Sequence, residues 1–328
     1  MTELKLYDNT RISDFRRCPR YFFFRHIKHW RPGGPPSNPL AFGGAWHDAM
    51  DTLWTAIHAG MNQADCIDAA LEAWSKSWVE YGMPHPRDMG PDVMKEFSPR
   101  TPIIAHEMLI AYYQKRHKMI KDMEIIAIER PFAVPLSAED ESLFYVGRID
   151  KVVAPTRSSV RGIEHKTTTS SKKSLDGDVK IRPVFAETFS PNSQVDGYLY
   201  TLHMLYPEKE VDVWVDASLV SKTGEDFRFI PVQKKHEHLD QWLWTTHYWI
   251  DQISHNKKLL EGASEEDRYL AAFPQDTSSC FDFNTQCGFL PLCKSRANPL
   301  TWGEDPPQHY ITDVWDPLEH IGTPVELL

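Results

Sequence analysis

Three residues in the middle of the chain carry side chains suited to metal-dependent cleavage of a phosphodiester bond. Asp150 lies near the end of one apolar segment, and Glu164 and Lys166 lie on the next, with 13 residues between Asp150 and Glu164. Because side chains alternate along a strand, Glu164 and Lys166 point to one face and His165 to the other. A hairpin would therefore bring two carboxylates and an ammonium group together.

These residue types predict a defined chemistry. Carboxylate oxygens are the ligands that Mg²⁺ and Mn²⁺ prefer, and such an ion polarises the scissile phosphate and acidifies a bound water. Lys166 would orient that water or stabilise the negative charge that develops, and the backbone carbonyl of His165 could also reach the metal. The same spacing fits a plain surface salt bridge between Glu164 and Lys166, so other residues have to support the site.

Three further side chains could complete this site. His47 follows Gly43-Gly44-Ala45-Trp46 at the start of a predicted helix, and imidazole is a suitable third ligand for Mn²⁺. Gln194 and Tyr198 lie four residues apart on another predicted helix and therefore share a face. As an isolated residue, however, one of fifteen histidines is more often an ordinary polar residue than a ligand, and Tyr198 could merely pack.

Cys280, Cys287 and Cys293 lie within 14 residues of each other, in a segment with little predicted regular structure. A site with four thiolates needs Cys18 or Cys66 as well, and Cys66 lies in an apolar helical pattern typical of a core residue, so Cys18 is preferred. Zinc and an iron–sulfur cluster both fit, because spacing without a C-x-x-C pair favours neither. The site would be structural and join the two ends of the chain; the alternative is a set of unrelated buried thiols.

The elements that must position these residues are helical in the first third of the chain and strand-rich in the middle. Ser13 is the expected N-cap of a short first helix that contains Pro19 or ends at it. Further helices are predicted over 43–59, 63–81, 91–121, 193–205 and 236–260, and strands over 125–128, 143–153, 160–166, 211–215 and 227–231. Loops are predicted over 31–39, over 170–182, where the chain should be mobile, and from 273 to the end.

Composition excludes several classes of protein. With 328 residues, of which 41% are hydrophobic and 25% charged, the chain can fill one large domain or two small ones. It has no apolar run of about 18 residues and no signal-peptide profile at its start, which predicts no membrane association and a cytoplasmic location. Five cysteines are too few for a disulfide scaffold, and a net charge of -10 means that any contact with nucleic acid must use a local basic face.

Two basic stretches could supply that face. The first is an arginine-rich segment interleaved with the aromatic residues 21–24, as in proteins that bind single strands; the second lies in the predicted mobile loop and could close over a substrate. The candidate DNA-binding residues are Arg16, Arg17, Arg20, Arg25, Lys172 and Lys173. The alternative is that Phe22 to Phe24 belong to the core and the arginines form a solvated rim.

Taken in order, these motifs resemble the PD-(D/E)XK nuclease superfamily, in its RecB-like branch with a cysteine-ligated iron–sulfur cluster, which includes CRISPR-associated adaptation exonucleases. The matching segments are Ser13–Tyr21, Gly43–His47, Gly147–Asp150, Ile163–Thr167, Gln194–Tyr198 and the last three cysteines. One departure is the C-x6-C-x5-C spacing, where the family often has a C-x2-C pair. Because no GxxxxGK[ST] motif is present, the resemblance is to a standalone nuclease rather than a helicase fusion.

The resemblance implies an α/β fold of the restriction-endonuclease-like type, a central mixed sheet flanked by helices. One integrated nuclease domain would contain a helical N-terminal part (1–122), a nuclease core (123–272) and an iron–sulfur segment with a tail (273–328). His47, Asp150, Glu164 and His165 would bind Mg²⁺ or Mn²⁺, and Lys166 would be the catalytic lysine. Gln194 and Tyr198 would contact DNA or position the nucleophile, and a 4Fe–4S cluster would be bound by Cys18, Cys280, Cys287 and Cys293.

The expected function is therefore that of a metal-dependent DNA exonuclease acting on single-stranded or frayed ends in recombination, replication or repair, in a bacterial cell or a phage-infected host. DNA is the expected partner, and a second copy of the chain or a recombination or replication protein is a further candidate. The alternative is a DNA-binding or assembly subunit that is stabilised by an iron–sulfur cluster or a zinc ion and whose nuclease site is vestigial. The intact His47, Asp150, Glu164 and Lys166 argue against that loss of activity.

Overall fold

The computed structural model describes residues 4–174 and 176–317. Its residues divide into two compact units, each assembled from separate stretches of the chain. Unit 1 comprises 1–33, 131–147 and 236–328, and unit 2 comprises 34–130 and 148–235. The boundary falls within strands β3 (Glu124–Pro135) and β4 (Leu143–Thr156).

The central sheet contains strands of both directions. Its order is β1 (Lys5–Tyr7), β4, β5 (Ser159–Thr168), β8 (Glu210–Leu219) and β9 (Phe227–Val232), with β3 paired to β4. β4 and β5 are antiparallel, β5 and β8 are parallel, and β8 and β9 are antiparallel. A mixed sheet flanked by helices confirms the predicted fold class.

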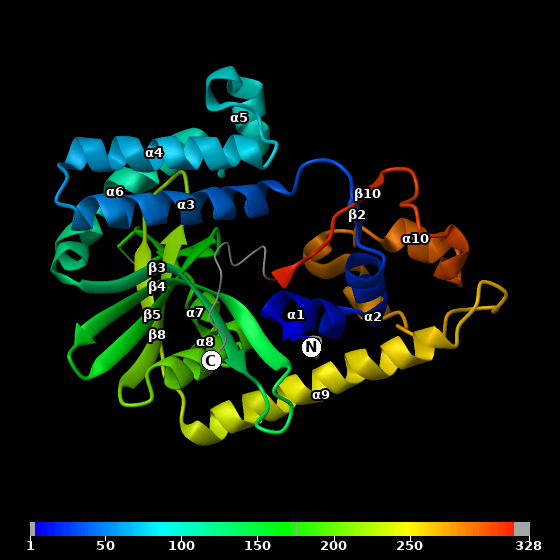
Figure 1. The fold of residues 1–328 in the computed structure, drawn as a ribbon. Coiled ribbons are helices and arrows are strands. Elements are labelled where there is room, and N and C mark those ends of the chain that lie inside the picture. The colour runs from blue at the N-terminus through cyan, green and yellow to red at the C-terminus, as the bar shows by residue number, and fades with distance from the viewer. Residues whose placement is uncertain (1–3, 175, 318–328) are drawn as a thin grey trace. The chain divides into compact units, whose positions relative to one another are not determined.

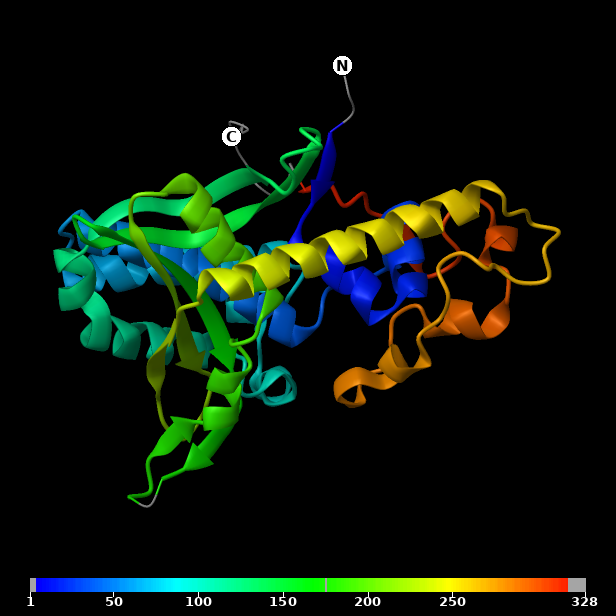
Figure 2. The same ribbon diagram turned by 90° about the horizontal axis from the view of Figure 1, so that it is seen from below.

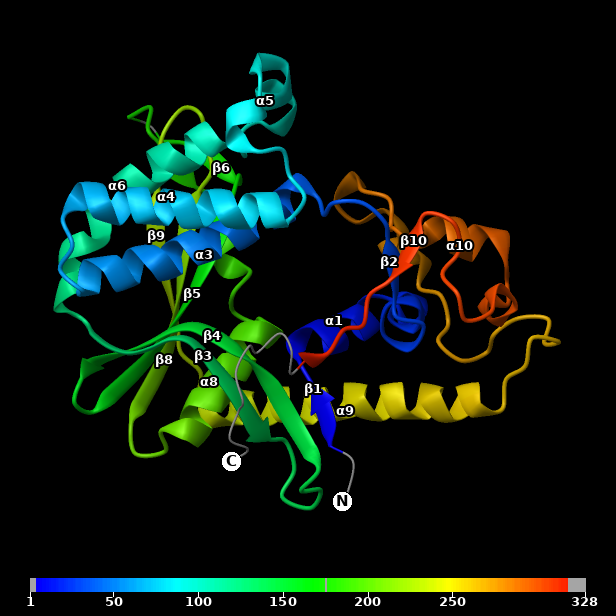
Figure 3. The same ribbon diagram turned by 45° about the horizontal axis from the view of Figure 1, so that its top comes forward.

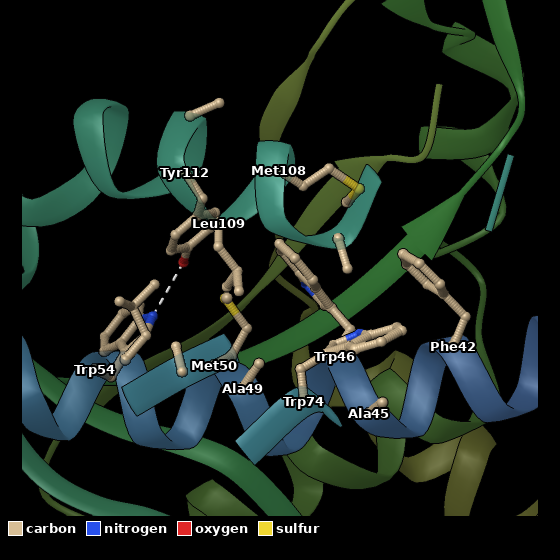
Figure 4. Close-up of a cluster of buried hydrophobic side chains, with 14 of the residues drawn as sticks. Phe42, Ala45, Trp46, Ala49, Met50, Trp54, Trp74, Met108, Leu109 and Tyr112 are labelled. Atoms are coloured by element: carbon tan, nitrogen blue, oxygen red, sulfur yellow. Dashed lines mark hydrogen bonds between the residues drawn. The ribbon is translucent and has the colours of Figure 1, made fainter. Parts of the chain in front are cut away.

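Three long helices of unit 2 cover one face of this sheet: α3 (Asn38–His58), α4 (Gln63–Glu80) and α6 (Pro102–Asp122) (Figure 1). Between them lies a core rich in aromatic rings, in which Trp46, Trp54, Trp74 and Tyr112 are fully buried (Figure 4). Burying a large apolar side chain contributes about 1.5–3 kcal/mol. Trp54 Nε1 also donates a hydrogen bond to the Tyr112 hydroxyl at 3.0 Å, which fixes α3 against α6.

Two predicted helices have different bounds in the structure. α3 begins at Asn38 rather than Gly43, so Gly44 lies inside the helix. A glycine is needed there, because a Cβ at this position would collide with the Tyr81 hydroxyl. The single helix predicted over 91–121 is wrong: α5 (Pro91–Phe97) ends before Pro99, and α6 starts anew at Pro102. Proline lacks the N–H that a continuing helix needs.

In unit 2, α8 (Ser193–Leu205) packs on the opposite face of the sheet. It lies close to β5: a Cβ added to Gly162 would come within 3.2 Å of the Leu202 side chain. The Asn192 side chain caps α8 by accepting hydrogen bonds from the N–H groups of Gln194 and Val195. This cap fixes Gln194 in the first turn of the helix.

The mobile loop predicted over 170–182 is instead a short hairpin. β6 (Ser171–Lys173) pairs antiparallel with β7 (Val179–Ile181), and Figure 2 shows the hairpin extending beyond the sheet of unit 2. Its base is held because Val179 and Ile181 are buried and the Ile181 N–H donates to Asp226 at 2.9 Å. Residue 175 lies outside the described residues. The short helix α7 (Pro183–Glu187) follows.

In unit 1, β1 is followed by two helices that are separated at Cys18. α1 (Asn9–Arg17) is capped by Asp8, which accepts from the Arg11 N–H at 2.6 Å, so the prediction that Ser13 caps it is wrong. Pro19 starts α2 (Pro19–Phe22), because proline suits the first position of a helix. A π-helical turn over Phe23–Ile27 and strand β2 (Trp30–Pro32) follow, and β2 pairs with β10 (Tyr310–Thr312) (Figure 3).

The C-terminal part of unit 1 is more regular than predicted. α9 (His236–Glu261) confirms the predicted long helix. The loop predicted after Ala272 contains a 3-10 helix (Thr277–Asn284), α10 (Leu290–Ser295) and a second 3-10 turn (Pro299–Trp302). Side chains of Asp276 and Asn298 cap the two 3-10 elements through Ser278 and Leu300, which explains why such short pieces form. Within the part of the chain that the structure describes, no helix is both long and apolar enough to cross a membrane.

Candidate active site

The structure brings Asp150, Glu164 and Lys166 together in unit 2. The antiparallel pairing of β4 with β5 sets Lys151 opposite Ile163, and therefore places Asp150 beside Glu164 one step further along. Asp150 Oδ2 accepts a hydrogen bond from the backbone N–H of His165 at 2.7 Å. Both carboxylates are buried, with Asp150 7% and Glu164 1% exposed. The placement of the two carboxylates side by side follows from the strand register.

Lys166 connects this pair of carboxylates to α8. Its ammonium group forms a salt bridge with Glu164 and donates to Gln194 Oε1 at 3.2 Å. Gln194 Nε2 in turn donates to the Tyr198 hydroxyl at 2.9 Å. The i and i+4 positions on one helix face thus continue the polar contacts that begin on β5. The side chain of Lys166 is 31% exposed, so the site opens to solvent at the ammonium group.

His47 reaches the same site from α3. Its Nδ1 lies 3.1 Å from Asp150 Oδ2. One turn later on α3, Asp51 forms a salt bridge with the fully buried Lys151. Sequence reasoning missed the Asp51–Lys151 pair, although its spacing of four residues from His47 was a usable signal. We call His47, Asp150, Glu164, Lys166 and Gln194 the carboxylate–lysine site.

Each ionisable group of this site changes the pKa of its neighbours. Burial lowers the pKa of His47, but the charge of Asp150, the hydrogen bond to it and the charge of Glu164 together outweigh burial and raise the pKa. Burial raises the pKa of Asp150, but the charge of His47, the hydrogen bond to it and the charge of Lys151 together outweigh burial and lower the pKa. The pKa of Glu164 is raised by burial and by the charge of Asp150. Burial lowers the pKa of Lys166, and Glu164 more than offsets this and raises it. Opposite charges therefore favour the charged forms of His47, Asp150 and Lys166, whereas burial favours the neutral form of Glu164.

The donor atoms of this site fit a hard divalent cation. Glu164 Oε2 is buried and has no hydrogen-bond donor among residues 4–174 and 176–317, so one carboxylate oxygen is free to bind a cation. Carboxylate oxygens with one imidazole nitrogen suit Mg²⁺ or Mn²⁺. Across the described residues, no three His, Cys, Asp or Glu side chains already form a metal-holding group. In this state His47 and Lys166 pair with the carboxylates instead.

The His165 side chain lies on the other face of β5, as the strand period predicts. It is fully buried, with its ring 5.8 Å from that of Trp54. Asp216 of β8 lies opposite His165 and accepts hydrogen bonds from the Tyr112 hydroxyl at 2.6 Å and from Arg116 at 3.3 Å. Burial raises the pKa of Asp216 to about 6. Sequence reasoning missed this network, although an aspartate within the apolar run 213–219 was a signal.

Four cysteines of unit 1 line one cavity of about 190 Å³. They are Cys18, Cys280, Cys287 and Cys293, and all are free thiols. The Asp276 N–H donates to Cys18 Sγ at 3.3 Å, and the Cys287 N–H donates to the Cys280 carbonyl at 2.8 Å. The fifth, Cys66, is buried in the core of unit 2, as expected for a core residue. Four sulfurs around one space suit a soft metal centre. We call this space the cysteine cavity.

Burial favours the protonated form of two thiols of the cysteine cavity, those of Cys287 and Cys293. Burial raises the pKa of Cys293 to about 12 and also raises the pKa of Cys287. Only thiolates bind metal, so binding of a metal centre has to release these protons.

The arginine-rich segment is partly structural. Phe22, Phe23 and Phe24 are fully buried, so they belong to the core and do not form a stacking surface for bases. Arg20 is also buried, and Arg25 donates to the Asp313 carbonyl at 2.5 Å. Arg17 pairs with Asp282. The candidates for DNA contact that remain exposed are Arg16, Lys172 and Lys173.

Comparison with known proteins gives the class of this chain. A model of the PD-(D/E)XK nuclease superfamily matches residues 9–294, which is most of the sequence. The chain therefore belongs to the PD-(D/E)XK nuclease superfamily. Among solved structures it is similar to a protein from Eubacterium rectale described as a "putative exonuclease", with 14% sequence identity and a TM-score of 0.44 over 74% of this chain and 78% of the other. The search of the curated proteins gave no match.

Proposed function

We propose that this chain is a metal-dependent deoxyribonuclease that degrades DNA from its ends, using Mg²⁺ or Mn²⁺. Its superfamily consists of nucleases, and the proposal is supported above all by one observation: Asp150, Glu164 and Lys166 meet on one face of β4 and β5, where Glu164 keeps a buried oxygen without a donor in the described part of the chain. Acidic ligands beside an ammonium group suit phosphodiester hydrolysis.

Lys166 would act as a fixed positive charge. Because Glu164 raises the pKa of Lys166 above its usual value, the side chain remains an ammonium ion at neutral pH and cannot serve as a general base. Its contacts with Glu164 and Gln194 restrict its direction. From there it can donate to the attacking water or to a phosphate oxygen, and Gln194 and Tyr198 would maintain its position.

Asp150, Glu164, His47 and the backbone carbonyl of His165 are the proposed metal ligands. A divalent ion held there would polarise the scissile phosphate and acidify a water molecule. His47 has to be neutral to ligate, whereas the charge of Asp150 favours its protonated form. Metal binding would therefore displace a proton from His47.

The preference for DNA ends and for single strands rests on the order of the motifs, which resembles the RecB-like branch, and recombination, replication or repair is the proposed setting. Arg16 of α1 and Lys172 and Lys173 of β6 are exposed cations that could contact phosphates. Such contacts are independent of sequence and weaken with salt.

We further propose that the cysteine cavity holds a 4Fe–4S cluster. Four thiolates suit either a zinc ion or an iron–sulfur cluster. The four cysteines line one cavity of about 190 Å³ together with nine other residues, and the choice of a cluster over zinc rests on the resemblance to the RecB-like branch. Iron and sulfide analysis of anaerobically purified protein, beside zinc analysis, tests this assignment.

The nuclease proposal is tested with end-labelled linear DNA, single- and double-stranded, beside a closed circle, in Mg²⁺, Mn²⁺ or EDTA. We expect metal-dependent loss of the linear substrates alone. Lys166→Ala should abolish this activity, whereas Lys76→Ala should not, because Lys76 on α4 also pairs with a glutamate but at the exposed surface. Cleavage of the circle would contradict action from ends. Cleavage of no substrate by cluster-loaded protein would favour a DNA-binding or assembly subunit.

A further inference from the structure

Arg20 is a charged side chain buried in unit 1. It lies on α2, two residues after Cys18, and is only 3% exposed. Its backbone N–H donates to the Pro274 carbonyl at 3.1 Å, which ties the first turn of α2 to the segment that precedes Cys280. The guanidinium group is therefore held between the two stretches of chain that supply the four cysteines.

The hydrogen bonds of Arg20 leave its charge without compensation. Nε donates to the Phe273 carbonyl at 2.8 Å and one terminal nitrogen donates to the Leu270 carbonyl at 3.1 Å, both neutral acceptors. The other terminal nitrogen is buried and has no partner in residues 4–174 and 176–317. A buried cation whose hydrogen bonds go only to neutral acceptors is strongly destabilising unless an anion lies nearby.

The anionic forms of the cavity thiols would supply that negative charge. Burial lowers the pKa of Arg20, and a negative charge on Cys293 or Cys18, both of which line the cysteine cavity, would oppose that effect. The same interaction favours the thiolate of Cys293 against the effect of burial. Arg20 and the thiolates therefore each provide the charge that the other requires.

Arg17 shows what a compensated arginine in the same part of unit 1 looks like. It lines the cysteine cavity, but it forms a salt bridge with Asp282 at 3.2 Å, and its guanidinium lies 5.0 Å from the centre of the Tyr21 ring. Its side chain is 35% exposed, so solvent screens its charge. The two arginines are three residues apart and differ in burial and in pairing.

We propose that Arg20 is the counter-cation of the thiolate-ligated centre in the cysteine cavity and sets the reduction potential of the iron–sulfur cluster held there. This inference rests on the cluster proposed above. Reduction adds one electron, supplied by dithionite in the test below, and so adds one negative charge to the cluster. A fixed positive charge in a medium of low dielectric constant stabilises the more negative, reduced form, and therefore raises the potential.

The test measures the reduction potential of the cluster in the full chain, by dithionite titration followed by electron paramagnetic resonance. We expect Arg20→Gln to lower the equilibrium constant for reduction at least tenfold, which is 59 mV for one electron. Arg20→Lys keeps the charge and should stay within twofold of the wild type. Arg17→Gln should also stay within twofold, because Asp282 and solvent already neutralise Arg17.

Four results would overturn the inference. One is an unchanged potential in folded, cluster-loaded Arg20→Gln, and another is an equal fall in Arg17→Gln. If Arg20→Gln does not fold, Arg20→Lys decides, and a tenfold fall there would show that charge is not the property that matters. A wild-type chain without iron would remove the proposed cluster together with this inference and leave the nuclease proposal intact.

Discussion

The carboxylate–lysine site and the cysteine cavity balance their charges in opposite ways. In the first, each buried carboxylate already has a cation: His47 lies against Asp150, and Lys166 pairs with Glu164. In the second, four cysteines line a cavity, burial raises the pKa of Cys293, and within the described residues the hydrogen bonds of the buried Arg20 go only to neutral carbonyls. The first site is close to neutral without a ligand, whereas the second has a charge that only a bound centre would neutralise.

This difference separates two uses of a metal. A site with internal ion pairs can keep its shape while metal and substrate exchange, as turnover requires. A site that depends on its ligand for charge balance gains folding stability from binding and should release the ligand slowly. The predictions below test this contrast between exchange and retention.

The largest effect is expected for Lys166→Ala. Loss of the ammonium group should lower the cleavage rate about 1,000-fold, since it removes a charge directed at the reacting phosphate. The fold should persist, because burial already raises the pKa of Glu164 and the unpaired side chain can take up a proton. Single-turnover cleavage and circular dichroism of the same preparation measure both effects. A tenfold loss or less would refute the proposed role.

At the cysteine cavity, Cys287→Ala should affect stability rather than chemistry. Loss of one ligand should release the iron and lower the free energy of unfolding by about 3 kcal/mol, since the bound centre no longer stabilises the fold. Cys66→Ala provides the matched control, because it removes a buried thiol from the core of unit 2 and should retain all the iron. Iron content and denaturant unfolding measure the outcome. Equal iron in both variants would rule out Cys287 as a ligand.

The pH dependence of stability tests the role of Asp216, which lies opposite His165 of β5. Burial raises the pKa of Asp216 to about 6. Between about pH 4 and pH 6 the folded chain therefore keeps a proton on Asp216 that the unfolded chain has lost. The free energy of unfolding consequently falls as pH rises through this range. Asp216→Asn removes the effect. In EDTA, the free energy of unfolding of the variant relative to that of the wild type should rise by on the order of 3 kcal/mol between pH 4 and pH 7. A constant difference across that range would contradict the raised pKa.

The smallest effect is expected for Tyr198→Phe. It removes the hydroxyl that accepts from Gln194 Nε2, but Gln194 keeps its contact with Lys166. Loss of one hydrogen bond costs about 1 kcal/mol, so the cleavage rate should fall about fivefold. Steady-state kinetics would resolve this change. A loss as large as that of Lys166→Ala would show that the hydroxyl contacts the reacting atoms itself.

Local patterns in the sequence were enough to predict much of the fold and the shared face of Glu164 and Lys166. Alternation along 160–166 fixes that face within one strand, and α8 follows from its own apolar period. The four-residue spacing of Gln194 and Tyr198 likewise predicted that they share a helix face, and the structure adds a hydrogen bond between them. Roles in catalysis and metal binding stay predictions for these residues.

Long-range contacts explain what the sequence could not predict. Asp216 is buried because Tyr112 and Arg116, about a hundred residues earlier, donate to it. The hairpin over 170–182 depends on Asp226 and lacks a strong local pattern. The sequence predicted that Arg20 is exposed and contacts DNA. Its burial could not be predicted, because its hydrogen-bond acceptors are the carbonyls of Leu270 and Phe273, about 250 residues later. A charged side chain is buried only where distant segments provide partners.

The division of unit 1 into three separate stretches of chain bears on the order of events during synthesis. Cys280, Cys287 and Cys293 are synthesised well after Cys18, because 261 residues lie between Cys18 and Cys280. Unit 2 ends at Lys235 and can fold before the last three cysteines are made. Delivery of the proposed metal centre to the cysteine cavity would therefore follow the synthesis of unit 2, and a chain truncated before residue 293 would lack one of the proposed ligands.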